Sequence, residues 1–222
     1  MLDAIIFDCD GVLVDSEPIH LDCFRSVLAA RGIELHTADY YDKYLGFDDH
    51  DCFVAVLANN DRPVAEDEVT AMIAEKTELV KKTFAAGVPA MAGALELMRS
   101  ARAAGMAVGI CSGGLREEIE LATAGIGALP LVDVVISATD VPRGKPDPAG
   151  YLLAMKLLAE KLRRRVRPER SWVVEDAPAG IQAAKSAGCH VLAVTNSYDR
   201  PALAGADRIV DSLAEVRLGQ FD

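Results

Sequence analysis

Ala4-Ile5-Ile6-Phe7-Asp8-Cys9-Asp10-Gly11 is the stretch that decides the fold of this chain. Its first half, residues 4–7, is a short continuous apolar run, which is typical of a strand that is buried on both faces of a parallel sheet. Its second half places two carboxylates directly after that strand. Because parallel α/β sheets bind ligands at the carboxyl ends of their strands, the stretch predicts both a strand and a candidate site.

Similar apolar runs follow further along the chain, with helical patterns between most of them. The runs cover residues 107–111, 132–137, 172–174 and 191–194, with a weaker one at 209–210. The helical patterns cover 93–104, 115–123, 148–164 and 179–187. Strands that alternate with helices form βαβ units, so we expect an α/β fold with a Rossmann-like parallel sheet.

The alternation stops between residues 16 and 84, where helical patterns follow one another without a strand. They lie at 18–31, 38–44, 49–59 and 66–84. This interruption predicts an inserted α-helical cap over residues 16–87, with an α/β catalytic core formed by residues 1–15 and 88–222. Pro18 suits the first turn of a helix, and the stretch 85–89, with Gly87 and Pro89, is typical of a linker.

Composition narrows the expected partners and surroundings. The formal net charge of −11 argues against nucleic acid and anionic membranes as partners. We find no apolar run that would span a membrane and no signal-peptide pattern at the N-terminus. The five cysteines are scattered without a CxxC pair, which favours neither a disulfide framework nor a zinc site. A cytoplasmic location is the expectation.

Two pairs of acidic residues suggest a metal site. Asp8 and Asp10 would repel each other unless a cation joined them, and their hard oxygen ligands favour Mg²⁺. Glu175 and Asp176 follow a second strand, 172–174, and would complete a cage from a distant segment. The alternatives are a polar turn for the first pair and a helix N-cap role for Asp176.

Two further segments suit a phosphate group. Ser112-Gly113-Gly114 lies between a strand and a helix, where a hydroxyl and backbone N–H groups can bind an anion. Lys145, in Arg143-Gly144-Lys145-Pro146-Asp147-Pro148, can neutralise a phosphate and a nucleophile together. Taken singly, the first segment is equally typical of an ordinary cap and turn, and the lysine of a solvated loop.

The order of these segments resembles the four motifs of the haloacid dehalogenase superfamily of phosphatases and phosphomutases. Residues 8–18 are similar to its first motif, Ser112 to the second, 144–148 to the third and 175–184 to the fourth. The position of the insertion resembles the small helical cap of the subgroup that contains phosphoglycolate phosphatases, sugar-phosphate phosphatases and β-phosphoglucomutase. The resemblance covers nearly the whole chain.

The resemblance implies a role for each motif residue. Asp8 is expected to be the nucleophile that forms an aspartyl-phosphate, and Asp10 the general acid and then base, with its backbone carbonyl also binding Mg²⁺. Asp176 is expected to bind Mg²⁺ directly, and Glu175 to help hold the metal. Ser112, Gly113 and Lys145 are expected to bind the phosphoryl group. Asp10 also argues against dehalogenation, because the dehalogenases of the superfamily lack the second aspartate.

Substrate choice is expected to lie in the cap, which would close over the site and exclude water. The candidates are Gly46 in the loop 44–50, His20 and Lys76 by analogy with the mutase, and Arg116 in the core. Solvated or packed side chains are the alternative for each. Asp48 and Asp49 are expected to cap a helix. They occupy the place in the cap loop where an enzyme with a bisphosphate ligand is expected to have a basic residue.

Three functions therefore remain open at the level of the sequence. The first is a Mg²⁺-dependent phosphatase for a small phosphorylated metabolite such as a sugar phosphate or phosphoglycolate. The second is a β-phosphoglucomutase-like phosphomutase, and the third a non-catalytic phosphometabolite-binding or receiver-like module. The acidic loop favours hydrolysis over mutase activity. We expect a monomer or a weak homodimer.

Overall fold

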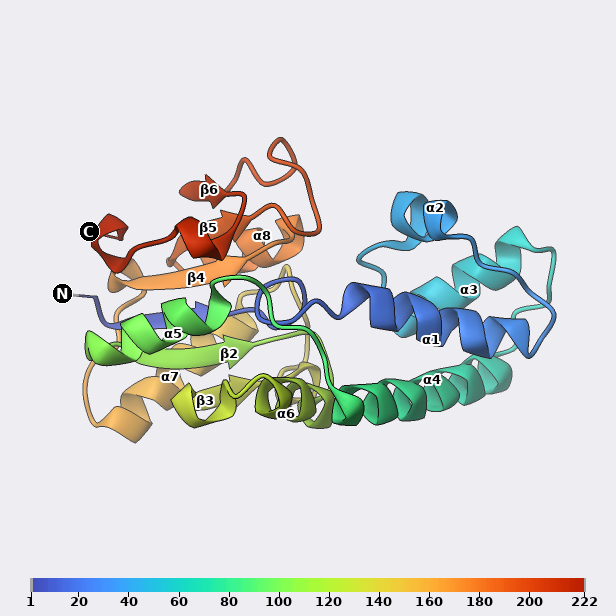
Figure 1. Ribbon diagram of the computed structural model, residues 1–222, viewed down its shortest axis with the longest axis horizontal. Coiled ribbons are helices and arrows are strands. Elements are labelled where there is room, and N and C mark those ends of the chain that lie inside the picture. Colours follow the sequence, from blue (N-terminus) through green and yellow to red (C-terminus); the bar gives the residue numbers. More distant parts are fainter. Residues whose placement is uncertain (1, 222) are drawn as a thin grey trace. The chain divides into compact units, whose positions relative to one another are not determined.

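The computed structural model describes residues 2–221, and the chain divides into two compact units. The sheet unit consists of Met1–Asp15 and Gly87–Asp222, and the helical unit of Ser16–Ala86 (Figure 1). Gly87 thus falls in the sheet unit, one residue from the boundary expected from the sequence. Each unit has its own core, so each is described by itself.

The sheet unit contains a six-stranded parallel sheet in the order β3-β2-β1-β4-β5-β6. Its strands are β1 (Ala4–Phe7), β2 (Ala107–Cys111), β3 (Val134–Ile136), β4 (Ser171–Glu175), β5 (His190–Val194) and β6 (Arg208–Val210). In the register of the sheet, Ile6 of β1 pairs with Gly109 of β2 and Val173 of β4. The strand order reverses at β1, which is where α/β sheets of this kind bind ligands. The expected α/β fold is confirmed.

Apolar side chains explain why β1 is central. All four of its residues are fully buried, as expected for a strand that is covered on both faces. Ala4 and Ile6 belong to a core cluster that includes Tyr151, Ala154 and Leu158 of α7. Figure 1 shows α5 on the near side of β2 and α7 behind it. The helices of this unit are α5 (Ala94–Ala103), α6 (Arg116–Gly125), α7 (Ala149–Leu162) and α8 (Pro178–Ser186).

The helical unit packs around its own apolar cluster. Its elements are α1 (Glu17–Ala29), α2 (Thr37–Asp39), a π-helical turn at Tyr40–Tyr44, α3 (Asp49–Asn59) and α4 (Glu66–Ala86). The centre of the cluster includes Phe24 and Phe53, whose rings contact edge to face with centroids 5.0 Å apart. The short helix expected at 38–44 is thus α2 followed by the π turn, closed by the Leu45 N–H to Tyr40 carbonyl hydrogen bond.

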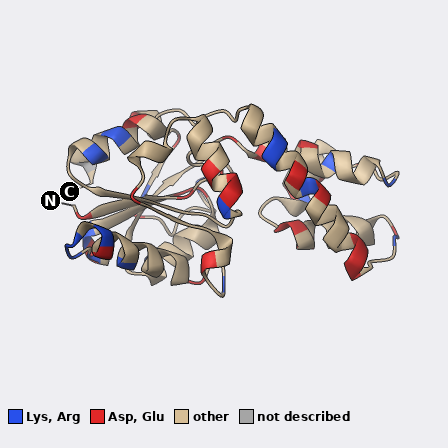
Figure 2. Ribbon diagram, turned by 90° about the horizontal axis from the view of Figure 1, so that it is seen from below, with Lys and Arg blue, Asp and Glu red and all other residues tan. Residues whose placement is uncertain are grey.

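Charged residues are distributed along the helices of the helical unit. Figure 2 shows acidic and basic positions interspersed along them. The longest helix, α4, has 21 residues and carries three acidic residues in its first turn. Across residues 2–221 we find no helix whose length and apolar character would allow it to span a membrane.

Candidate active site

Three carboxylates meet at the carboxyl ends of β1 and β4. Asp8 and Asp176 directly follow these strands, whereas Glu175 is the last residue of β4 and not, as expected from the sequence, the first residue after it. The Asp8 N–H donates to the Val174 carbonyl at 2.9 Å, and this bond fixes the start of the loop after β1 against β4. One carboxylate oxygen from each of Asp8, Glu175 and Asp176 lies within 4.8 Å of the others. The sheet therefore brings the two acidic pairs together.

In the part of the chain that the structure describes, one ammonium group contacts this acidic cluster. Lys145 Nζ lies 2.7 Å from Asp8 Oδ1 and 2.5 Å from Glu175 Oε1. Although burial opposes it, the charges of Asp8 and Glu175 hold the pKa of Lys145 well above its usual value. Lys145 is therefore protonated and in contact with the expected nucleophile, as the sequence predicts for a group that neutralises it.

The cluster remains short of positive charge. Burial, followed by repulsion from Glu175 and Asp10, raises the pKa of Asp8 to about 7, although Lys145 opposes the shift. Burial and then the charges of Asp8 and Glu175 likewise raise the pKa of Asp176 well above its usual value. Buried carboxylates with hard oxygen atoms and a deficit of positive charge suit a divalent cation such as Mg²⁺. The donor set thus fits the cation that the sequence suggests.

Glu175 is held by hydrogen bonds to both of its carboxylate oxygens. Oε1 accepts from Lys145 Nζ and, at 2.7 Å, from the hydroxyl of the fully buried Tyr151. Oε2 accepts from the backbone N–H groups of Asp176 and Ala177 at 3.1 and 3.2 Å. A Cβ on Gly180 would lie 1.8 Å from Oε1, so helix α8 can approach this carboxylate only with glycine there. Glu175 is thus held in place by its other partners where it contacts Lys145.

Tyr151 is a residue that the sequence analysis missed. It lies in α7, six positions after Lys145, where the sequence pattern indicates only a helix. A hydroxyl on the buried face of a helix needs a polar partner. This requirement could have drawn attention to Tyr151 in the sequence, although it does not identify Glu175 as the partner.

The expected phosphate-binding segment that contains Ser112 lies beside Asp10. Ser112 Oγ is 3.5 Å from Asp10 Oδ2, at the limit of a hydrogen bond, and Ser112 Oγ also accepts from the Gly114 N–H at 3.0 Å. Ser112 is buried, while Asp10 is partly exposed. A Cβ on Gly113 would meet nothing within 4 Å, so packing does not require glycine at that position.

The side chain of Arg116 forms hydrogen bonds within the sheet unit. Its guanidinium donates to Asp140 Oδ2 at 2.7 Å and to the Val135 carbonyl at 3.0 Å. The two bonds join the start of α6 to the middle of β3 and to the short 3₁₀ helix Ala138–Asp140 that follows it. This geometry favours the structural alternative over substrate binding for Arg116.

The loop after β5 also reaches the cluster, and the sequence analysis missed it. Ser197 Oγ donates to Asp176 Oδ2, and Asn196 Nδ2 donates to the Gly11 carbonyl at 2.6 Å. Both residues follow a strand that was recognised, 191–194. The rule that drew attention to Asp8 and Asp176, polar residues directly after a parallel strand, could have indicated them.

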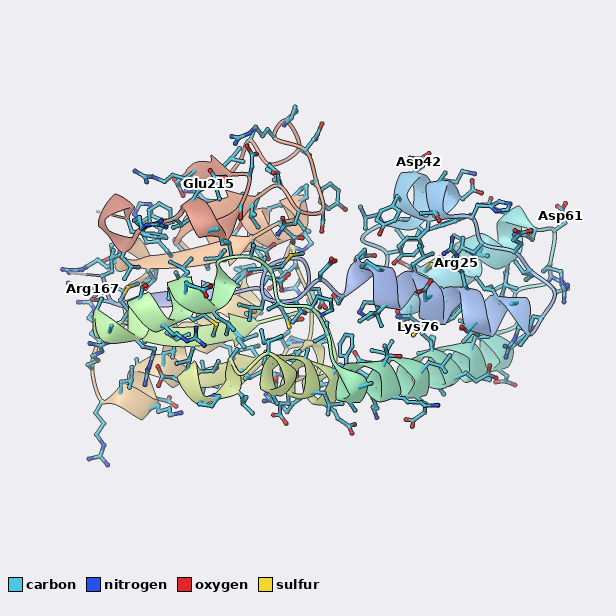
Figure 3. The ribbon with its side chains drawn as sticks, in the orientation of Figure 1. Arg25, Asp42, Asp61, Lys76, Arg167 and Glu215 are labelled. Carbon is cyan, nitrogen blue, oxygen red and sulfur yellow. The ribbon has the colours of Figure 1, made fainter. Side chains whose placement is uncertain are left out.

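The helical unit brings together two of its three candidate residues. Lys76, labelled on α4 in Figure 3, is 2% exposed, and its Nζ lies 2.5 Å from Asp49 Oδ1 and 3.1 Å from His20 Nδ1. The same Nζ is 4.3 Å from the centroid of the Phe24 ring. Gly46 is separate from this group, in an exposed turn between the π-helical turn and α3.

The two aspartates of the cap loop have different roles. Asp48 is the N-cap of α3, and its side chain accepts from the Asp51 N–H at 2.8 Å, as expected from the sequence. Asp49, for which a cap role was also expected, instead pairs with Lys76. The reason is its position in the first turn of α3, from which its side chain reaches α4.

Comparison with known proteins gives a consistent result. The family model for haloacid dehalogenase-like hydrolases matches residues 2–188. The chain is 36% identical to validoxylamine A 7'-phosphate phosphatase of Streptomyces hygroscopicus subsp. limoneus, over 98% of this chain and 97% of that protein. It is 31% identical to hexitol phosphatase A of Escherichia coli, over 96% of this chain and 92% of that protein.

Solved structures share the same fold. The structure of a CbbY variant from Rhodobacter sphaeroides in complex with xylulose-(1,5)bisphosphate superposes with a TM-score of 0.86 at 27% identity, over 100% of both chains. A β-phosphoglucomutase from Clostridium difficile superposes with a TM-score of 0.83 over 99% of this chain and 95% of that one. Its identity of 23% supports likeness of fold alone.

Proposed function

Because the chain belongs to the haloacid dehalogenase-like hydrolase family and is a phosphoric monoester hydrolase, we propose that it hydrolyses a monophosphate of a sugar or sugar-like polyol through a phosphoryl group carried on Asp8. The observation that carries the proposal is the contact between Lys145 Nζ and Asp8 Oδ1 at 2.7 Å, inside a buried acidic cluster. The receiver-like and non-catalytic alternatives are set aside because the family is one of hydrolases.

In the first step, a carboxylate oxygen of Asp8 attacks phosphorus and the bond from phosphorus to the leaving alcohol oxygen breaks. Asp10 donates its proton to that oxygen. Lys145 lowers the repulsion between the anionic nucleophile and the phosphate, and Ser112 with the backbone N–H groups of its loop binds phosphoryl oxygens. In the second step Asp10 takes a proton from water, the water oxygen attacks phosphorus, and the bond to Asp8 breaks, releasing phosphate.

A divalent cation completes the proposed site. Asp8, Asp176 and the backbone carbonyl of Asp10 would hold Mg²⁺, with Glu175 beside them, and the deficit of positive charge around the buried carboxylates supports this assignment. When bound, the cation supplies positive charge that offsets the charge on the transferring phosphoryl group. Glu175 contributes mainly by holding Lys145 and the backbone of the loop that carries Asp176.

The relatives and the helical unit support a monophosphate as the substrate. The two relatives above 30% identity are named for a validoxylamine phosphate and for hexitols. In the helical unit, Asp49 compensates the charge of the buried Lys76, which leaves that lysine less suited to a second phosphate. The alternative functions are those of two structural neighbours: binding of a bisphosphate, as in the CbbY complex, and β-phosphoglucomutase activity. The pairing of Lys76 with Asp49 disfavours both.

We also propose a cellular location, a partner and an oligomeric state for the protein. All five cysteines are free and buried thiols, which supports a reducing, cytoplasmic setting. The small phosphorylated metabolite is the partner we propose, and a monomer or weak homodimer stays a prediction.

A panel of phosphate esters tests the proposal. We expect phosphate release from a hexitol 6-phosphate and glucose 6-phosphate with kcat/KM at least about 10-fold above that for xylulose 1,5-bisphosphate, a difference of about 1.4 kcal/mol in transition-state binding. β-Glucose 1-phosphate serves as the mutase probe. Its efficient conversion to glucose 6-phosphate without phosphate release would reject hydrolysis in favour of mutase activity, and a preference for the bisphosphate would reject the substrate class.

A further inference from the structure

Three loops converge tightly at the carboxyl ends of β1, β4 and β5. Gly11, in the turn after β1, has φ +69°, and a Cβ there would lie 1.9 Å from Asp176 Oδ2 and 2.9 Å from Ser197 Oγ. The turn that carries Asp8 and Asp10 can therefore approach the other two loops only because residue 11 lacks a side chain.

The loop after β5 makes one hydrogen bond to each of the other two loops. Ser197 Oγ donates to Asp176 Oδ2, and Asn196 Nδ2 donates to the Gly11 carbonyl at 2.6 Å. The loop is itself fixed to β6, because the Thr195 N–H donates to the Val210 carbonyl at 3.1 Å. The sheet thereby supports a polar bridge between the two acidic loops.

The Ser197 bond singles out one oxygen of the Asp176 carboxylate. Asp176 is 3% exposed, and its Oδ1 accepts no hydrogen bond from the residues that the structure describes. A carboxylate held through one oxygen cannot rotate freely, so its second oxygen keeps a fixed direction. Removal of a group that orients a metal ligand in this way typically weakens metal binding by about 10- to 100-fold.

We propose that Ser197 is a positioning residue for the cation site: its hydroxyl holds Asp176 through Oδ2 so that Oδ1 is presented to the cation, while Asn196 holds the turn that carries Asp8 and Asp10. The inference rests on the proposed function, which places the cation at Asp8 and Asp176. It assigns to the loop after β5 a role in holding the cation site.

The test measures Mg²⁺ binding directly, by isothermal titration calorimetry of the full chain without substrate. Ser197→Ala is expected to weaken Mg²⁺ binding about 10-fold, and Ser197→Thr, which retains a hydroxyl, to bind within about twofold of the unchanged protein. Thr195→Val is the matched control, because it removes a hydroxyl from the same loop whose partner is Asp211 and not a cluster carboxylate. Circular dichroism in EDTA checks that each variant is folded.

Two negative results are distinguishable. If the unchanged protein binds Mg²⁺ and Ser197→Ala binds it equally well, the positioning role is wrong and the proposed function stands. If the unchanged protein itself binds no Mg²⁺, the cation site fails and this inference fails with it. Should Ser197→Ala not fold, Ser197→Cys replaces it, with a weak donor of similar size, and an unchanged affinity in that variant likewise overturns the role. Loss of affinity in Thr195→Val equal to that in Ser197→Ala would also contradict it.

Discussion

The two units bury charge in opposite ways. In the sheet unit, the cluster of Asp8, Glu175 and Asp176 has, among the residues that the structure describes, one ammonium group in contact with it, that of Lys145 on Asp8 and Glu175. In the helical unit, Lys76 has an opposite charge 2.5 Å away on Asp49, with the imidazole of His20 beside it. One cluster carries an excess of buried negative charge, whereas the other is close to balanced.

We interpret this difference as one between the proposed catalytic site and a structural contact. Burying unbalanced charge costs stability, so its presence at a strand end indicates a group that is kept for a ligand. A balanced pair can be satisfied within the unit that contains it. The experiments below test whether the first cluster needs a cation and whether the second needs only its own partner.

Asp8→Asn has the largest expected effect. An amide is a far weaker nucleophile than a carboxylate, so turnover of p-nitrophenyl phosphate should fall by about 10³-fold or more. Because the variant also removes a repelling charge, its melting temperature in EDTA should equal or exceed that of the unchanged protein. Glu160→Gln, an exposed carboxylate on α7, is the control and should retain activity. Full activity of Asp8→Asn would remove Asp8 as the nucleophile.

Addition of Mg²⁺ should have the next largest effect. EDTA is expected to abolish phosphatase activity and Mg²⁺ to restore it. A cation that binds only the folded state at about 100 times its dissociation constant stabilises that state by about 2.7 kcal/mol, which thermal unfolding can measure. A turnover rate that does not depend on metal would reject the proposed cage.

Breaking the Lys76–Asp49 pair should give an asymmetric result. Asp49→Asn leaves an ammonium whose side chain is 3% exposed without its carboxylate, which we expect to cost about 2–3 kcal/mol of unfolding free energy. Lys76→Met leaves a carboxylate that is 34% exposed and can be hydrated, so about 1 kcal/mol is expected. Urea unfolding followed by circular dichroism compares the two variants with the double variant. Equal costs would show that Lys76 is not desolvated.

Substitution of Asp3 should have the smallest effect, and it contrasts with Asp8 because the two aspartates flank opposite ends of β1. At the other end of β1, Asp3 accepts hydrogen bonds from Arg167, labelled in Figure 3, and these lower the pKa of Asp3. A lowered carboxyl pKa stabilises the fold above the ordinary value near 4 and ceases to do so as the pH falls through the lowered value. Asp3→Asn should therefore cost about 1 kcal/mol at pH 7.

The pH dependence provides the check on this last prediction. Unfolding free energies of Asp3→Asn and of the unchanged protein should converge as the pH is lowered from 5 to 2, while kcat/KM at pH 7 stays the same for both. A difference in stability that is constant over that range would mean that the charge of Asp3 is not what Arg167 recognises.

Local features of the sequence were sufficient for much of this architecture. Apolar runs identified the strands, and consecutive helical patterns identified the inserted helices. The position of Asp8 and Asp176 after such runs located the candidate site, because strand ends in a parallel sheet lie together whatever the loops contain. The π turn at Tyr40–Tyr44 was not foreseen, because its i to i+5 bond has no distinct apolar period.

What the amino-acid sequence determined by itself is the order of strands, helices and acidic residues, since these depend on near neighbours in the chain. Only the tertiary structure decided the partners: Tyr151 for Glu175, Ser197 for Asp176 and Asp49 for Lys76. Each pairing joins segments that are distant in sequence. It depends on burial and on the reach of one side chain toward another, and no spacing along the chain encodes either quantity.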